Sequence, residues 1–142
     1  MARTTDIASL CAGSAFSADE RSVVAEFVRA TNAGEIESLV ALFAEDAQVN
    51  DQLRNFWGRE AIASWLRREI VGESVELDAL GIRKHYDVVM LSAGIRGDFE
   101  WPRSAQPMIF DLHFTVRASR IVRLLVLLAR VDTSEPELRR AS

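Results

Sequence analysis

The hydrophobic period of this chain changes once, near residue 75, and that change constrains the fold more than any other feature. Up to about residue 72 the apolar residues recur at helical spacing, whereas from residue 75 onward they alternate. Helices followed by consecutive strands are typical of an α+β fold, in which the helices pack on one face of a curved, mainly antiparallel sheet. The predicted strands are 75–86, 88–101, 108–117 and 120–130.

Three helices are predicted in the N-terminal half, and capping residues mark their ends. Ser17 and Glu20 form a capping box, in which each side chain accepts a hydrogen bond from the backbone N–H group of the other. Gly34 suits the left-handed conformation that ends a helix, and Gly72 is expected to close the third one. The predicted helices cover 17–32, 36–43 and 58–72, with one short extended piece at 47–50.

No repeat, low-complexity tract or linker divides the chain, so one domain is expected. With 142 residues the chain is long enough to bury about two-thirds of its extended surface. We place the domain at residues 18–131. Residues 1–17 are expected to form an arm or a short helix, and residues 132–142 a flexible tail.

Charge and composition argue against several classes of function. The formal net charge of −4 disfavours a nucleic-acid partner, because phosphates require a basic surface. The single cysteine, Cys11, cannot form an internal disulfide, and two histidines without clustered acids predict neither a metal site nor a cofactor. The longest apolar run, Leu124 to Ala129, is too short to span a bilayer, and the N-terminus lacks the apolar run of a signal peptide. We therefore expect a cytoplasmic protein without a membrane partner.

The predicted strand at 108–117 carries apolar side chains on both faces. An exposed sheet face with several large apolar side chains usually marks a protein interface. We therefore predict a homodimer in which two sheets pack through the outer faces. Alternation divides the strand into Phe110, Leu112 and Phe114 on the face assigned to the dimer, and Ile109, Asp111 and His113 on the other.

Several short motifs occur in an order known from one family of proteins. They are Ala33–Glu37, Leu42–Ala47, Val49–Asp51, Gly58–Ile62, Phe110–Asp111 and Ser119–Ile121. In their order and most of their spacings, from about Ala18 to Val131, the chain resembles the NTF2-like superfamily, which includes ketosteroid isomerases and SnoaL-like polyketide cyclases. The resemblance implies a cone-shaped, cystatin-like fold that encloses an apolar pocket, on a scaffold that hosts many functions.

By that resemblance, two acids would serve proton transfer next to a carbonyl group. Asp51 falls at the position of the catalytic base, and Asp111 at that of a protonated acid that donates to the developing oxyanion. His113 lies two residues from Asp111 on the same strand face, where it would assist catalysis or serve a structural role. Phe27 replaces the oxyanion tyrosine of the family, so steroid isomerase activity itself is not expected.

Each candidate also has a plain structural interpretation. Asp51 could be a solvated or capping acid, and Asp111 could pair with Arg123 across the sheet. Arg54 could hold a polar group of a ligand or pair with Glu69. The predicted ligand contacts are Phe27, Arg54, Trp57, Trp65, Ile95, Trp101, Leu124 and Val126.

Two functions follow from these residues. The first is a cofactor-independent acid/base enzyme, of the isomerase, cyclase or dehydratase type, that acts on a small apolar carbonyl-containing molecule. The second is a non-catalytic module that binds a small apolar ligand or serves mainly for dimerisation.

Overall fold

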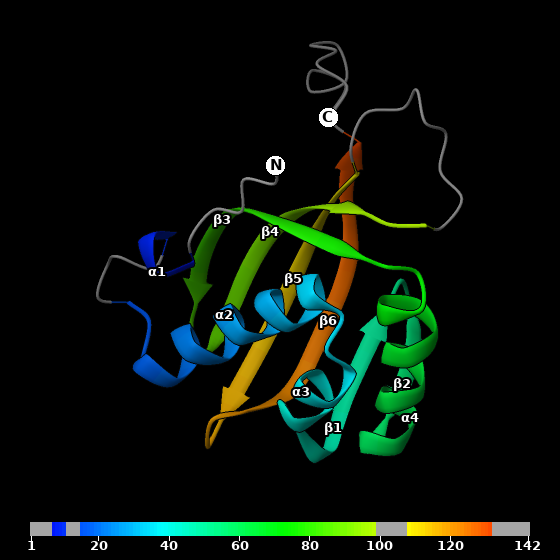
Figure 1. Cartoon of the computed structure of the whole chain (residues 1–142). Helices are drawn as coiled ribbons and strands as arrows, with labels where there is room; N and C mark the ends of the chain where they lie inside the picture. The colour runs from blue at the N-terminus through cyan, green and yellow to red at the C-terminus, as the bar shows by residue number, and fades with distance from the viewer. Residues whose placement is uncertain (1–6, 11–14, 99–107, 132–142) are drawn as a thin grey trace.

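The computed structural model describes residues 7–10, 15–98 and 108–131. One mixed sheet of six strands forms the body, in the order β2-β1-β6-β5-β4-β3, and α2 crosses its concave face (Figure 1). The helices are α1 (Ile7–Leu10), α2 (Ala18–Ala33), α3 (Ile36–Ala41), α4 (Gly58–Trp65) and the π-helical η1 (Leu66–Val71). The strands are β1 (Phe43–Asp51), β2 (Arg54–Trp57), β3 (Glu76–His85), β4 (Val88–Arg96), β5 (Met108–Arg117) and β6 (Arg120–Val131).

The predicted caps of α2 are present. The backbone N–H of Glu20 donates to Ser17 Oγ at 3.0 Å, and the backbone N–H of Ser17 donates to Glu20 Oε1 at 2.9 Å. Gly34 ends the helix in the left-handed conformation, with φ of 69°. These contacts confirm both ends of the first predicted helix.

The expectation of three N-terminal helices needs correction. Of the three predicted helices, only the first two, α2 and α3, precede the sheet, and the third begins as α4 after the hairpin of β1 and β2. Phe43, expected on the second helix, instead begins β1, where it pairs with Ile121 of β6. The third predicted helix also changes character after Trp65, because the backbone continues as the π-helix η1.

The sheet has more strands than predicted, and one of its pairings is parallel. β1 runs parallel to β6 and antiparallel to β2, while the other neighbours are antiparallel. Gln52 and Leu53 join β1 to β2 with φ of 55° and 72°, as two-residue hairpins require. β4 ends at Arg96, and the remainder of the strand predicted to reach residue 101 lies partly outside the described residues.

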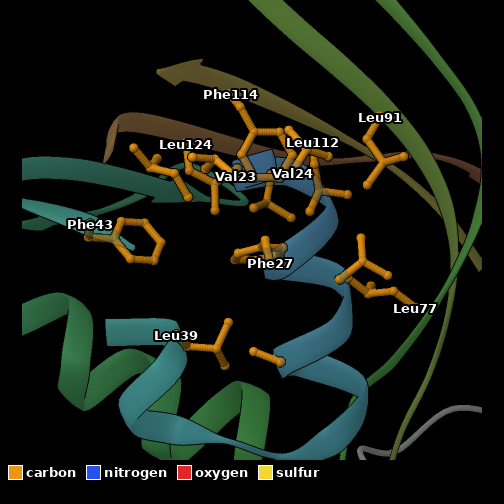
Figure 2. Packing of buried hydrophobic residues seen from close by; sticks show 14 of the residues in the cluster. Val23, Val24, Phe27, Leu39, Phe43, Leu77, Leu91, Leu112, Phe114 and Leu124 are labelled. Carbon is orange, nitrogen blue, oxygen red and sulfur yellow. The ribbon is translucent and has the colours of Figure 1, made fainter. Parts of the chain in front are cut away.

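The two faces of β5 are the reverse of those predicted. Leu112 and Phe114 are buried in the core, and the rings of Phe114 and Phe27 meet edge-on with centroids 5.2 Å apart (Figure 2). Phe110 also packs against this core. These three residues therefore cannot form the outer dimer face, because α2 covers their side of the sheet. Pairing of two copies through the sheet stays a prediction.

The described helices include none with the length and apolarity needed to cross a bilayer.

Candidate active site

A cavity of about 380 Å³ lies between the helices and the concave face of the sheet, and we call it the central cavity. Most of its wall is apolar, and a few polar side chains interrupt it. Such a composition is typical of sites for small molecules. The lining residues are Phe27, Thr31, Asp51, Gln52, Arg54, Trp65, Glu69, Ile70, Glu73, Val75, Leu77, Ile95, Met108, Phe110, Leu112 and Val126.

Asp51 is the predicted base, and it reaches the cavity wall from the end of β1. Its side chain is 13% exposed, and its Oδ2 atom accepts hydrogen bonds from Trp65 Nε1 and an Arg54 guanidinium N–H, each at 2.9 Å. Asp51 lies opposite Val126 of β6, which also lines the cavity. Oδ1 makes no hydrogen bond within residues 7–10, 15–98 and 108–131, so it can accept one from a bound molecule.

Arg54 links Asp51 to Glu69 in a chain of charges along one wall. Its guanidinium donates to both carboxylate oxygens of Glu69, at 2.9 Å and 2.7 Å, in addition to Asp51. The hydrogen bonds from Arg54 lower the pKa of Glu69 below its ordinary value, and Glu69 in turn raises the pKa of Arg54. The predicted alternative of an Arg54–Glu69 pair is therefore confirmed.

Trp65 and η1 position this wall. Trp65 is buried at the end of α4 and stacks on Phe56 of β2, with ring centroids 5.9 Å apart. The π-helix that follows carries Glu69 and Ile70 to the cavity. A π-helical turn widens a helix by one residue, and such turns occur frequently at functional sites.

Five of the eight predicted ligand contacts line the central cavity: Phe27, Arg54, Trp65, Ile95 and Val126. Their contact with a ligand stays a prediction.

Of the other three predicted contacts, two do not line the central cavity, and the third lies outside the described residues. Leu124 is fully buried in the core, opposite Phe114 and Val49, where protein side chains surround it (Figure 2). Trp57 is 66% exposed and is not part of the cavity lining. Trp101 lies outside the described residues.

Asp111 and His113 lie on the outer face of the sheet. Asp51 is opposite Val126 in the ladder, whereas Asp111 is opposite Leu127, and successive residues of a strand point to opposite faces. Asp111 Oδ1 accepts a hydrogen bond from Ser92 Oγ at 2.8 Å, so Ser92, not Arg123, is its partner among the described residues. The expected convergence of the two acids on one cavity is therefore wrong.

Sequence reasoning missed two polar residues of the wall, Thr31 and Glu73. Thr31 lies four residues after Phe27 on the apolar stripe of α2, so helical spacing could have placed it there. Gln52 follows Asp51 in the hairpin, and its Nε2 donates to the carbonyl oxygen of Val126 at 3.0 Å. No signal in the sequence marks Glu73.

The parts of the chain that the structure describes contain no group of three or more histidine, cysteine or acidic side chains arranged to hold a metal ion.

Several solved structures are similar to this chain. A proposed polyketide cyclase from Sinorhizobium meliloti matches with 27% identity and a TM-score of 0.66, over 74% of this chain and 93% of that one. A proposed ketosteroid isomerase from Kribbella flavida matches with 12% identity and a TM-score of 0.67, over 83% of each chain. The epoxide hydrolase/cyclase-like enzyme SalBIII, described in pyran ring formation in polyether salinomycin, matches with 19% identity and a TM-score of 0.65, over 77% of this chain and 89% of that one.

The fold and the central cavity define a class of small α+β proteins with a cavity between helices and a curved sheet. Within that class, the similarity to these solved structures supports an NTF2-like fold for this chain. Comparison of the sequence alone finds no matching family model and no matching curated protein.

Proposed function

We propose that the protein is a cofactor-independent acid/base enzyme that binds a small, mainly apolar carbonyl compound in the central cavity. The observation that carries the proposal is the position of Asp51 on an apolar wall, where Trp65 and Arg54 both hold Oδ2. Polyketide cyclases and an epoxide hydrolase/cyclase-like enzyme among the structural neighbours support an isomerase or cyclase type of reaction.

Asp51 would act as a proton shuttle. Its Oδ1 atom removes a proton from the carbon next to the carbonyl, which breaks a C–H bond, forms the protonated carboxyl and leaves an enolate. The same carboxyl then returns the proton to a different atom of the substrate. The hydrogen bonds from Trp65 and Arg54 keep the carboxylate in one orientation, which reduces the loss of freedom at the moment of reaction.

Exchange of a ketone's protons with solvent tests this role directly. The probe is 1-tetralone in D₂O, and NMR follows the loss of the proton signals next to its carbonyl. We expect the protein to accelerate this exchange, and Asp51→Asn to slow the catalysed rate by about 10²- to 10⁴-fold, the usual range for a general base. Asp46→Asn, which changes an exposed acid of the same strand, is the matched control and should exchange at the wild-type rate.

The alternative is a binding module without catalysis. It is favoured by one observation, the pairing of Arg54 with both Asp51 and Glu69, which engages these two acids within the protein. In that case 1-tetralone would bind, but the wild-type protein and the Asp51→Asn variant would exchange its protons at the same uncatalysed rate. That result would contradict the enzyme proposal.

A further inference from the structure

Thr31 stands out among the buried polar groups of the molecule. Its Oγ1 atom is the one buried side-chain nitrogen or oxygen of the described residues without a hydrogen-bond partner. The residue is 3% exposed and lines the central cavity from α2. Because a buried hydroxyl normally has a partner, an unsatisfied one at a cavity wall requires a physical explanation.

The backbone around Thr31 is fixed on both sides. Its carbonyl oxygen accepts the N–H of the cap residue Gly34 at 3.1 Å. The next residue, Asn32, forms two hydrogen bonds with the backbone of Leu77 on β3, one as donor at 3.0 Å and one as acceptor at 2.7 Å. The hydroxyl is therefore held at one place in the cavity wall, as a group that recognises a ligand must be.

The simplest alternative to a ligand is a hydrogen bond between the Thr31 hydroxyl and the backbone of its own helix. A threonine inside a helix often donates to the carbonyl oxygen four residues earlier, which here belongs to Phe27. The hydroxyl makes no such bond, since it has no partner at all within the described part of the chain. The neighbouring wall is also apolar, because Phe27, Leu77 and Leu112 line it.

We infer that the Thr31 hydroxyl is a specificity-determining group that hydrogen-bonds an oxygen of the bound molecule. This inference rests on the proposed function, because it concerns the ligand of the same cavity. A hydroxyl both donates and accepts, so it recognises a ketone or an alcohol and not a hydrocarbon of the same shape. The ligand is then an apolar skeleton that carries at least one oxygen.

Binding of a matched pair of probes tests the inference without any need for turnover. The probes are 1-tetralone and tetralin, which share a bicyclic skeleton and differ by the carbonyl oxygen, and NMR titration gives the dissociation constants. The wild-type protein should prefer 1-tetralone. Thr31→Val keeps the shape but removes the hydroxyl, and should reduce this preference by about 3- to 10-fold, the effect of one hydrogen bond. Thr31→Ser keeps the hydroxyl and should retain the preference.

Each other outcome overturns the inference in a recognisable way. If Thr31→Val keeps the wild-type preference, the hydroxyl does not contact the ligand, whereas the role of Asp51 in proton exchange is unaffected. If Thr31→Val weakens the binding of both probes equally, Thr31 contributes only to the shape of the cavity. If the wild-type protein binds neither probe, the proposed function fails and this inference fails with it. A thermal melt of each variant provides the control for folding, and Thr31→Val should melt no lower than wild type, because it removes an unsatisfied buried group.

Discussion

At the scale of single residues, an acidic side chain can take part in a reaction in the central cavity only if it points from the inner face of its strand. Asp51 lies opposite Val126 of β6, and Asp111 lies opposite the next residue of β6, Leu127. That one-residue difference places the first carboxyl at the central cavity and the second on the outer face of the sheet. A resemblance in sequence does not reveal this one-residue difference, because it matches positions along the chain and not the directions of side chains.

Asp111 gives the simplest test of this assignment. Asp111→Asn keeps an Oδ1 atom that can accept the hydrogen bond from Ser92 Oγ, so we expect a change of less than about 1 kcal/mol in the free energy of unfolding. Denaturant titration measures the change. Exchange of 1-tetralone protons should also continue at the wild-type rate. If the Asp111→Asn variant folds normally but exchanges the protons much more slowly, Asp111 takes part in the reaction. That result would contradict the strand register described here.

Glu69 gives a prediction about pH. The hydrogen bonds from Arg54 lower its pKa below the ordinary value of 4.5, so its ionised form is favoured in the folded protein. The stabilisation is therefore present above that ordinary value and is lost as the pH falls through the lowered pKa. At pH 7 the Glu69→Gln variant should be less stable than wild type by about 0.5–1 kcal/mol, because the pair is partly exposed.

Denaturant titrations of wild type and Glu69→Gln at several pH values check this prediction. The difference in unfolding free energy should shrink as the pH falls through the lowered pKa of Glu69, because protonated Glu69 no longer forms an ion pair with Arg54. In an Arg54→Met background, the pH-dependent part of the difference should become smaller, and what remains is due to Arg68, which lies 3.6 Å from Glu69. A difference that stays constant from neutral to acidic pH would show that the carboxylate charge contributes nothing.

At the scale of elements, the end of η1 depends on Gly72. Its N–H donates to the carbonyl oxygen of Arg67 at 2.8 Å, and a Cβ atom at this position would meet the carbonyl oxygens of Arg67 and Arg68, both at 2.6 Å. Gly72→Ala should therefore destabilise the protein by about 1–3 kcal/mol, as overpacking usually does. Gly81→Ala is the matched control in thermal melts, because a Cβ there meets nothing within 4 Å. Equal melting temperatures would contradict the close approach at Gly72.

Elements with strong local signals could be predicted, and those set by distant contacts could not. The capping box of Ser17 and Glu20 and the alternation in β5 are encoded within a few residues, and the structure contains both. The hairpin of β1 and β2 was missed because Gln52 and Leu53 lack the asparagine or glycine that usually marks such a turn. The inward face of β5 was missed because it depends on Phe27 of α2, far away in the sequence.

At the scale of the whole molecule, the α+β class and the superfamily resemblance were accessible from the sequence. The change of hydrophobic period predicted helices followed by strands, and the motifs predicted an enclosed cavity. The composition of the cavity wall was predicted in part: Asp51, Phe27, Trp65 and Val126 belong to it, while Thr31 emerged only from its burial and missing partner. An error of one residue in strand register moves a side chain to the other face of the sheet. For this reason the apolar residues of the cavity wall were easier to predict than its polar groups.

The parallel pairing of β1 with β6 has a consequence for the order in which the protein matures during synthesis. β1 leaves the ribosome before its partner β6, which is the last of the described strands, so Asp51 cannot meet Val126 until β6 has emerged. Contacts between distant segments form slowly, because the chain between them must first be brought together. The wall of the central cavity, which includes both Asp51 and Val126, is therefore complete in a nascent chain only after β6 has emerged and paired with β1.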